Sequence, residues 1–310
     1  VHCLALTAGG RTLVTGGNDG GVRLWDRTTG APVGDVLRHP GSVRRMAVSG
    51  DGRLLAAAGF GASVSLWDLT TRTALPPIVH EGRSGVGVVA FGPDDAVLLT
   101  TFDKTAYLWD PKTGTPIAKC DGHDRGIEAA AFSRDGKTLV TGSWDGTVRL
   151  WEVPSGRALG RRSHDGPVTA VAVSPDGRMI ATGCQDNTAR LWTATTFRPL
   201  GPPIRHRGEL SVVAFAPDSC AVLTASGTAQ LMRLPDLAAP ADDLGTLVEV
   251  WTSTSLAEDG TLALLPPDRW KALRGRARDA GPRVVWPLST LREPHLGDTG
   301  PFGRAHLSGR

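Results

Sequence analysis

Two sets of side chains in the middle of the chain combine a hydroxyl, an imidazole and a carboxylate, the groups that a nucleophilic hydrolase needs. The sets are His123, Thr141 and Asp145, and then His164, Thr182 and Asp186. In such an enzyme the imidazole accepts the hydroxyl proton while the carboxylate orients the imidazole. An active site needs this set once, whereas here it recurs and is followed each time by a Trp. The recurrence indicates a structural role, so we predict no catalytic residues and no enzyme.

Two other candidate sites fail on spacing. Gly136-Lys137-Thr138 could end a phosphate-binding loop, but such a loop needs a Gly five residues earlier, where the chain has Ala131. The cysteines lie far apart, without the paired spacing of a zinc site or a disulfide framework: Cys3, Cys120, Cys184 and Cys220. We therefore expect no metal and no cofactor, and reduced thiols in a cytoplasmic protein.

The elements that would position these residues repeat along the chain. The clearest copy is GKTLVTGSWDGTVRLW at residues 136–151, which predicts strand, turn and strand, because Asp-Gly between β-rich runs is a strong hairpin signal. Five copies end in Leu-Trp at intervals of 42, 42, 42 and 41 residues: Trp25, Trp67, Trp109, Trp151 and Trp192. A sixth copy, GTAQLMRL, has Met232 in place of the Trp.

Each unit contains four strand-like segments. In unit five they are residues 168–174, 178–183, 188–192 and a Pro-broken 198–204, and the Pro predicts that the fourth strand is outermost. Four strands per roughly 40–45 residues is the pattern of propeller blades. The sequence thus predicts an all-β fold, a β-propeller of four-stranded antiparallel blades over residues 1–238, with six blades visible.

Residues 1–238 resemble a WD-repeat β-propeller. The resemblance rests on Trp25-Asp26, Trp67-Asp68 and Trp109-Asp110, on the weaker Trp151-Glu152 and Trp192-Thr193, and on Gly122-His123. It implies that an Asp, a His, a hydroxyl and the Trp form a hydrogen-bonded chain through each blade, which would satisfy buried polar groups. This network would comprise His123, Thr141, Asp145 and Trp151 in unit four, His164, Thr182, Asp186 and Trp192 in unit five, and Thr15, Asp19 and Trp25 in unit one.

Other units depart from that network. Unit one lacks the His, and unit two has Ala57 and Gly61 at the hydroxyl and Asp positions. Unit three has Leu99 at the hydroxyl position but keeps Asp103. Unit six has lost the turn residues, so units two and six are expected to be the least stable blades.

The residue before each turn Asp is the candidate binding position. These positions are Asn18, Phe60, Phe102, Trp144 and Gln185, and three consecutive units place an aromatic there. The resemblance implies that they surround one rim of the central channel, a face that WD-repeat proteins often use for partners. Exposed aromatics are enriched at binding hot spots, which favours a protein or peptide partner. The alternative is that each ring packs over its own hairpin.

The sequence leaves three alternatives for how the ring of blades closes. Units two to six have a His before the first strand, whereas unit one begins with its first strand, on Val1. WD-repeat propellers usually have seven blades and lend an N-terminal strand to the last one. We expect a seventh blade upstream, a degenerate blade in the tail, or a ring of six.

The repeat is lost near Pro240. Helices are predicted over residues 244–253 and 269–280, with a short strand over 261–265, in a small helical module at 239–282; residues 283–310 are expected to be disordered. Residues 248–282 resemble a module that follows the propeller in large planctomycete proteins, many with a serine/threonine kinase domain. This implies an alternative function as the regulatory or substrate-recruiting part of a larger signalling protein.

The composition limits the kinds of partner that the chain is expected to bind. No apolar run approaches the roughly 18 residues of a membrane helix, so no membrane contact is expected. From Asp268 onward nine Lys and Arg stand against four Asp and Glu without interleaved aromatics, which favours a solvated face over a nucleic-acid contact. The preference for Arg over Lys, with abundant Ala, suggests a GC-rich bacterial genome. We predict a scaffold for protein–protein interaction, and nothing indicates its oligomeric state.

Overall fold

The structure is a computed structural model that describes residues 1–82, 84–234, 254–256 and 262–264. Residues 1–234 form six antiparallel sheets, and each sheet comes from one sequence unit. The predicted all-β fold of propeller blades is confirmed. Among the described residues, no helix has both the length and the apolar character needed to cross a membrane.

Sheets one to five each have four strands, and sheet six has three. Sheet one contains β1 (Cys3–Leu6), β2 (Thr12–Gly16), β3 (Gly21–Asp26) and β4 (Leu37–Arg38), with a short 3-10 helix, η1 (Ala8–Gly10). Sheet two contains β5 (Val43–Val48), β6 (Leu54–Gly59), β7 (Ser63–Asp68) and β8 (Thr73–Val79). Sheet three contains β9 (Val86–Phe91), β10 (Leu98–Phe102), β11 (Thr105–Trp109) and β12 (Pro116–Cys120).

The remaining sheets continue the same order. Sheet four contains β13 (Ile127–Phe132), β14 (Thr138–Ser143), β15 (Thr147–Glu152) and β16 (Ala158–Ser163). Sheet five contains β17 (Val168–Val173), β18 (Met179–Cys184), β19 (Thr188–Thr193) and β20 (Ile204–Arg205). Sheet six contains β21 (Val212–Phe215), β22 (Ala221–Ser226) and β23 (Thr228–Arg233).

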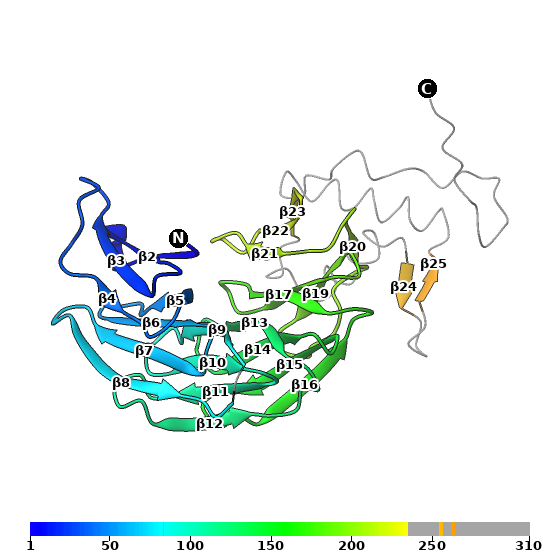
Figure 1. Ribbon diagram of the computed structural model, residues 1–310. Helices are drawn as coiled ribbons and strands as arrows, with labels where there is room; N and C mark the ends of the chain where they lie inside the picture. The colour runs from blue at the N-terminus through cyan, green and yellow to red at the C-terminus, as the bar shows by residue number, and fades with distance from the viewer. Residues whose placement is uncertain (83, 235–253, 257–261, 265–310) are drawn as a thin grey trace.

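The sheets follow one another along an arc, from sheet one in blue to sheet six in yellow (Figure 1). Within each sheet the strands lie in chain order, and the first strands contact one another from sheet to sheet on the inside of the arc. In sheet five the expected fourth strand is reduced to β20 and a bridge at Pro199, since Pro cannot donate a hydrogen bond to a sheet ladder.

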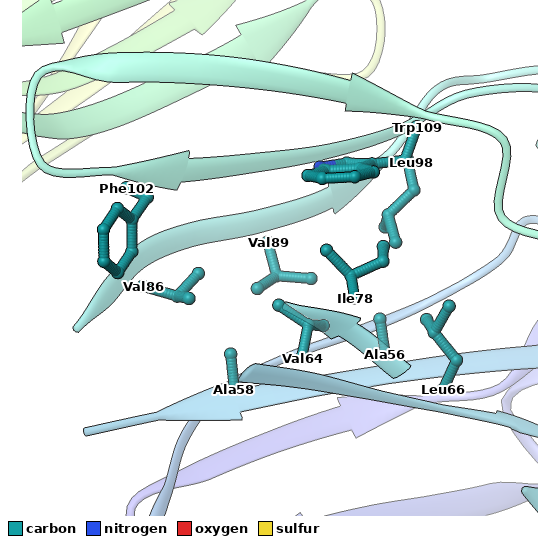
Figure 2. Packing of buried hydrophobic residues seen from close by; sticks show 10 residues of the cluster. All are labelled: Ala56, Ala58, Val64, Leu66, Ile78, Val86, Val89, Leu98, Phe102 and Trp109. Carbon is teal, nitrogen blue, oxygen red and sulfur yellow. The ribbon is translucent and has the colours of Figure 1, made fainter. Parts of the chain in front are cut away.

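The core lies between consecutive sheets. Side chains alternate along a strand, so Leu55 and Ala57 of β6 pack toward sheet one, whereas Ala56 and Ala58 pack toward sheet three. Figure 2 shows the second of these clusters, in which Ala56 and Ala58 face the apolar residues of β9 and β10. Both faces of β6 are therefore buried, which explains its continuous apolar run LLAAAG.

The Asp of each Trp-Asp dipeptide closes the turn after the third strand. Asp26 Oδ1 accepts hydrogen bonds from the backbone N–H groups of Thr28 and Thr29, both at 2.8 Å. Asp68 and Asp110 make the same pair of bonds in sheets two and three. These bonds lower the pKa of all three carboxyl groups.

Beyond residue 234 the structure describes one small hairpin, β24 (Thr254–Leu256) paired with β25 (Leu262–Leu264). The strand expected over 261–265 corresponds to β25. The helices predicted over 244–253 and 269–280, and the tail over 283–310, lie outside the described residues.

Candidate binding rim and its support

One rim of the arc is built from two kinds of segment that bond to each other. The first is the turn between the second and third strands of a sheet, and the second is the segment that leads to the next sheet. In sheet four Gly146 O accepts from His164 N at 2.8 Å, and Trp144 N donates to Gly126 O at 2.9 Å. Equivalent bonds join His39 to Gly20 and His80 to Ala62. The rim is therefore a fixed surface of paired backbone.

Sheet four carries a complete polar network beneath this rim. His123 Nδ1 lies 2.8 Å from Asp145 Oδ2, and its Nε2 lies 2.8 Å from Thr141 Oγ1. Trp151 Nε1 donates to the same Thr141 oxygen at 2.8 Å. With the Nδ1 proton directed at the carboxylate, Nε2 accepts the Thr141 hydroxyl proton, and every member has a partner.

The electrostatics of this network fit a structural role. Burial alone would raise the pKa of Asp145, but hydrogen bonds from Thr147 and from the Asp124 N–H outweigh it and hold that pKa at about 2. Burial lowers the pKa of His123, against the opposing effect of Asp145. Thr141 is fully buried and its oxygen is shared between the imidazole and the indole, so no substrate can reach it as a nucleophile.

Sheet five repeats the network with one difference. His164 Nε2 and Trp192 Nε1 both lie 2.9 Å from Thr182 Oγ1. His164 Nδ1, however, lies 3.8 Å from Asp186 Oδ2 and has no hydrogen-bond partner. Asp186 instead accepts from the Thr188 hydroxyl at 2.6 Å.

Sheet one has a shortened version. Trp25 Nε1 donates to Thr15 Oγ1 at 2.8 Å, as the Trp of sheets four and five does to its Thr. Asp19 is exposed and pairs with Arg23 at 2.6 Å, and this bond is the main cause of its pKa of about 2. The structure thus brings Thr15 and Trp25 together and leaves Asp19 at the surface.

In sheet three the prediction that Leu99 occupies the hydroxyl position is wrong. Thr100 Oγ1 is the acceptor of the Trp109 indole N–H at 2.8 Å and lies 3.1 Å from His80 Nε2. Phe102 pairs directly with Thr105 across a two-residue turn. This turn is shorter than in sheet four, which moves the hydroxyl one residue closer to the Trp.

Sheets two and six contain polar pairs that the sequence pattern missed. In sheet two His39 Nδ1 lies 2.8 Å from Ser65 Oγ, and Ser65 is directly opposite Ala57 on the neighbouring strand. In sheet six His206 Nε2 lies 2.8 Å from Thr224 Oγ1, and its Nδ1 lies 3.2 Å from Ser226 Oγ. A search for hydroxyls on both strands of each hairpin would have found them.

The five candidate rim residues differ in exposure. Phe60 is 67% exposed, Trp144 is 42% exposed and Asn18 is exposed, whereas Gln185 is half-buried. Phe102 is only 5% exposed, so the prediction that it belongs to the binding rim is wrong.

The physical reason lies in the short turn of sheet three. The Phe102 ring stacks on the His80 imidazole, with centroids 4.8 Å apart and planes only 4° from parallel. It also packs in the cluster with Val86 between sheets two and three (Figure 2). In this sheet an aromatic ring stacks on the buried His, whereas in sheet four the His is hydrogen-bonded to Asp145.

The arrangement of the sheets agrees with comparison to known families. The family described as WD domain, G-beta repeat matches residues 1–26, 30–68, 77–110, 114–152 and 158–193. No curated protein matches the chain. The matches fall on sheets one to five and together cover more than half of the sequence. This chain belongs to the WD-repeat family.

Proposed function

We propose that this chain is a non-catalytic scaffold that binds a protein or peptide at its rim, through contacts with Phe60 and Trp144. WD repeats generally mediate protein–protein interaction. The observation that carries the proposal is the exposure of these two rings, 67% for Phe60 and 42% for Trp144, on a rim fixed by backbone hydrogen bonds. Aromatic side chains supply a large contact area at little cost in conformational entropy.

The charges beside the two rings suggest what the partner presents. The Arg44 guanidinium lies over the Phe60 ring at 3.9 Å, and Trp144 Nε1 donates to Glu128 Oε2 at 3.0 Å. Each ring is thus in contact with one charged residue, of which Glu128 is exposed and Arg44 is half-buried. A peptide with an apolar side chain for the rings and both an acidic and a basic group would complement this surface.

The test removes both rings together and measures partner binding. Proteins captured from the source cells by the wild-type chain are expected to be lost with the double variant Phe60→Ala, Trp144→Ala. The matched control is Val79→Ala, Leu159→Ala, which removes exposed apolar side chains from the outer strands of the same two sheets. The thermal unfolding temperature of both double variants should stay close to that of the wild type. If the rim variant still captures the same proteins, or if the control loses them equally, the proposal fails.

The alternative function, the regulatory part of a larger signalling protein such as a serine/threonine kinase, has less support. It rests on the resemblance of residues 248–282, most of which lie outside the described residues. An immunoblot of the source cells distinguishes the two functions. A band far above the 32.5 kDa of this sequence would favour the larger protein.

Three further expectations belong to this proposal. The division into a propeller at 1–238, a module at 239–282 and a tail at 283–310 rests on where the repeat ends. A cytoplasmic and bacterial setting rests on the four free cysteines and the preference for Arg. The absence of enzymatic activity rests on the burial of Thr141 and Thr182 in the networks of sheets four and five.

A further inference from the structure

Sheets four and five offer a direct comparison, because both contain the His, Thr, Asp and Trp of the network but differ in a residue that contacts the turn Asp. Sheet four has Ser143 before the turn, and sheet five has Cys184 at the same place. Ser143 Oγ donates to Arg125 O at 2.9 Å and accepts from Asp145 N at 3.1 Å. Cys184 Sγ makes the equivalent contacts, to Gly166 O at 3.1 Å and from Asp186 N at 3.3 Å. A sulfur atom therefore replaces an oxygen in an otherwise similar frame.

The second difference is a gap between the imidazole and the carboxylate. His123 Nδ1 and Asp145 Oδ2 in sheet four are 2.8 Å apart, whereas His164 Nδ1 and Asp186 Oδ2 in sheet five are 3.8 Å apart. The His164 side chain is fully buried and its Nδ1 has no hydrogen-bond partner. An unpaired buried nitrogen is costly and needs an explanation.

Three potential ligand atoms surround that gap. One atom each from His164, Cys184 and Asp186 lies within 4.8 Å of the other two. In a tetrahedral zinc site the bonds are about 2.0–2.3 Å long, which separates two ligand atoms by about 3.3–3.8 Å. The 3.8 Å between Nδ1 and Oδ2 is too long for a hydrogen bond and slightly longer than the separation of a nitrogen and an oxygen on one zinc ion, so a small inward movement of the two side chains would seat an ion between them.

We propose that His164 Nδ1, Cys184 Sγ and Asp186 Oδ2 bind one Zn²⁺ ion, with water as the fourth ligand. This site lies in the rim segments of sheet five, away from Phe60 and Trp144 of sheets two and four, and it differs from the expectation that the chain has no metal site. Sequence spacing could not reveal it, because His164 comes from the segment between sheets, Cys184 ends β18, and Asp186 lies in the turn.

The surrounding residues orient each ligand. Thr182 directs its hydroxyl at Arg190 O at 3.3 Å, so its oxygen can accept both the Trp192 N–H and a proton on His164 Nε2. That tautomer leaves Nδ1 with the lone pair that a metal needs. Thr188 binds Asp186 Oδ1 with its hydroxyl and its N–H, which leaves Oδ2 for the ion.

Two groups oppose the cation. Arg190 Nη2 lies 3.6 Å from Asp186 Oδ2, but it also lies 3.3 Å from the exposed Asp165 Oδ2 and can pair there when the ion binds. The Asp165 N–H also points at Asp186 Oδ2, at a long 3.4 Å.

The thiol must also lose its proton. Burial raises the pKa of the Cys184 thiol to about 11, so binding must transfer the thiol proton to solvent. The Asp186 side chain is 11% exposed, which gives the ion a way in.

The experiment titrates the purified full chain with Zn²⁺ and with Co²⁺. We expect one ion per chain and a near-ultraviolet charge-transfer band from sulfur to Co²⁺. Cys184→Ser gives sheet five the residue that sheet four has at the equivalent position, Ser143. Because sheet four folds with Ser there, the variant is expected to fold. This variant should lose the band and bind Zn²⁺ more than about tenfold more weakly.

Cys220→Ser is the matched control, because Cys220 is an exposed free thiol away from the three ligands. It should keep the band and the affinity of the wild type. The proposal is overturned if the wild type binds no ion, if Cys184→Ser keeps the band, or if Cys220→Ser loses it.

Discussion

The protonation of a buried imidazole affects the free energy of unfolding, and His80 is the clearest example. His80 lies among the rings of Phe102, Tyr107 and Trp109, and its closest polar partner is the Thr100 hydroxyl. Burial in this apolar pocket lowers the pKa of His80 to about 4, compared with about 6.5 in an unfolded chain. The native protein therefore keeps this imidazole neutral over a range in which the unfolded chain binds a proton.

The sign of the resulting pH dependence follows from proton binding. Above about pH 6.5 neither state is protonated at His80, so the full free energy of unfolding is present. As the pH falls toward 4 the unfolded state gains protons first, so stability falls by up to about 1.4 kcal/mol per pH unit, on the order of 3 kcal/mol in total. Urea unfolding at pH 7, 6 and 5 measures this slope. His80→Gln should be less stable at pH 7 and should have a shallower slope, and an unchanged slope would contradict the assignment.

At the scale of the single hairpin, turn length decides which side chains are buried. The repeat predicted four strands in each unit, and sheet three has four, but counting back from Trp109 placed Leu99 at the hydroxyl position. The count assumed turns of equal length, and a change of one residue moves each side chain to the opposite face of the strand. Thr100 and Phe102 were misplaced for this reason. Ser65 was missed because in sheet two the hydroxyl lies on the third strand of the sheet instead of the second. The proximity of Cys184 to His164 could not be predicted because it depends on tertiary packing.

The hairpins of sheets two and three yield a paired prediction. Phe102→Ala removes a ring that is 5% exposed from the cluster between the two sheets, and such losses cost about 3–5 kcal/mol of unfolding free energy. Phe60→Ala removes an equivalent residue that is 67% exposed and held only by Arg44, so its cost should stay within about 1 kcal/mol. Chemical unfolding of both single variants gives the comparison. Equal losses would mean that the two turns do not differ as described.

On the scale of the whole molecule, each sheet gains stability from the neighbours that bury its faces. In repeat architectures the total is approximately a sum of unit stabilities and interface terms. Buried clusters cover both faces of sheets two to five, whereas among the described residues the clusters join sheet one to sheet two alone. Its first strand accordingly exposes Leu4 and Leu6.

This packing argues against part of the ranking expected from sequence, which placed unit two among the least stable blades because of Ala57 and Gly61. In the structure β6 is buried on both faces, and Ser65 supplies the missing hydroxyl to His39. We therefore expect backbone amides of β2 in sheet one to exchange with deuterium faster than those of β6 in sheet two, although sheet one keeps its Thr15–Trp25 bond. Hydrogen exchange of the full chain, followed by mass spectrometry of peptides from both strands, measures the order. Faster exchange in β6 would mean that the polar network, rather than burial between neighbouring sheets, governs the stability of each blade.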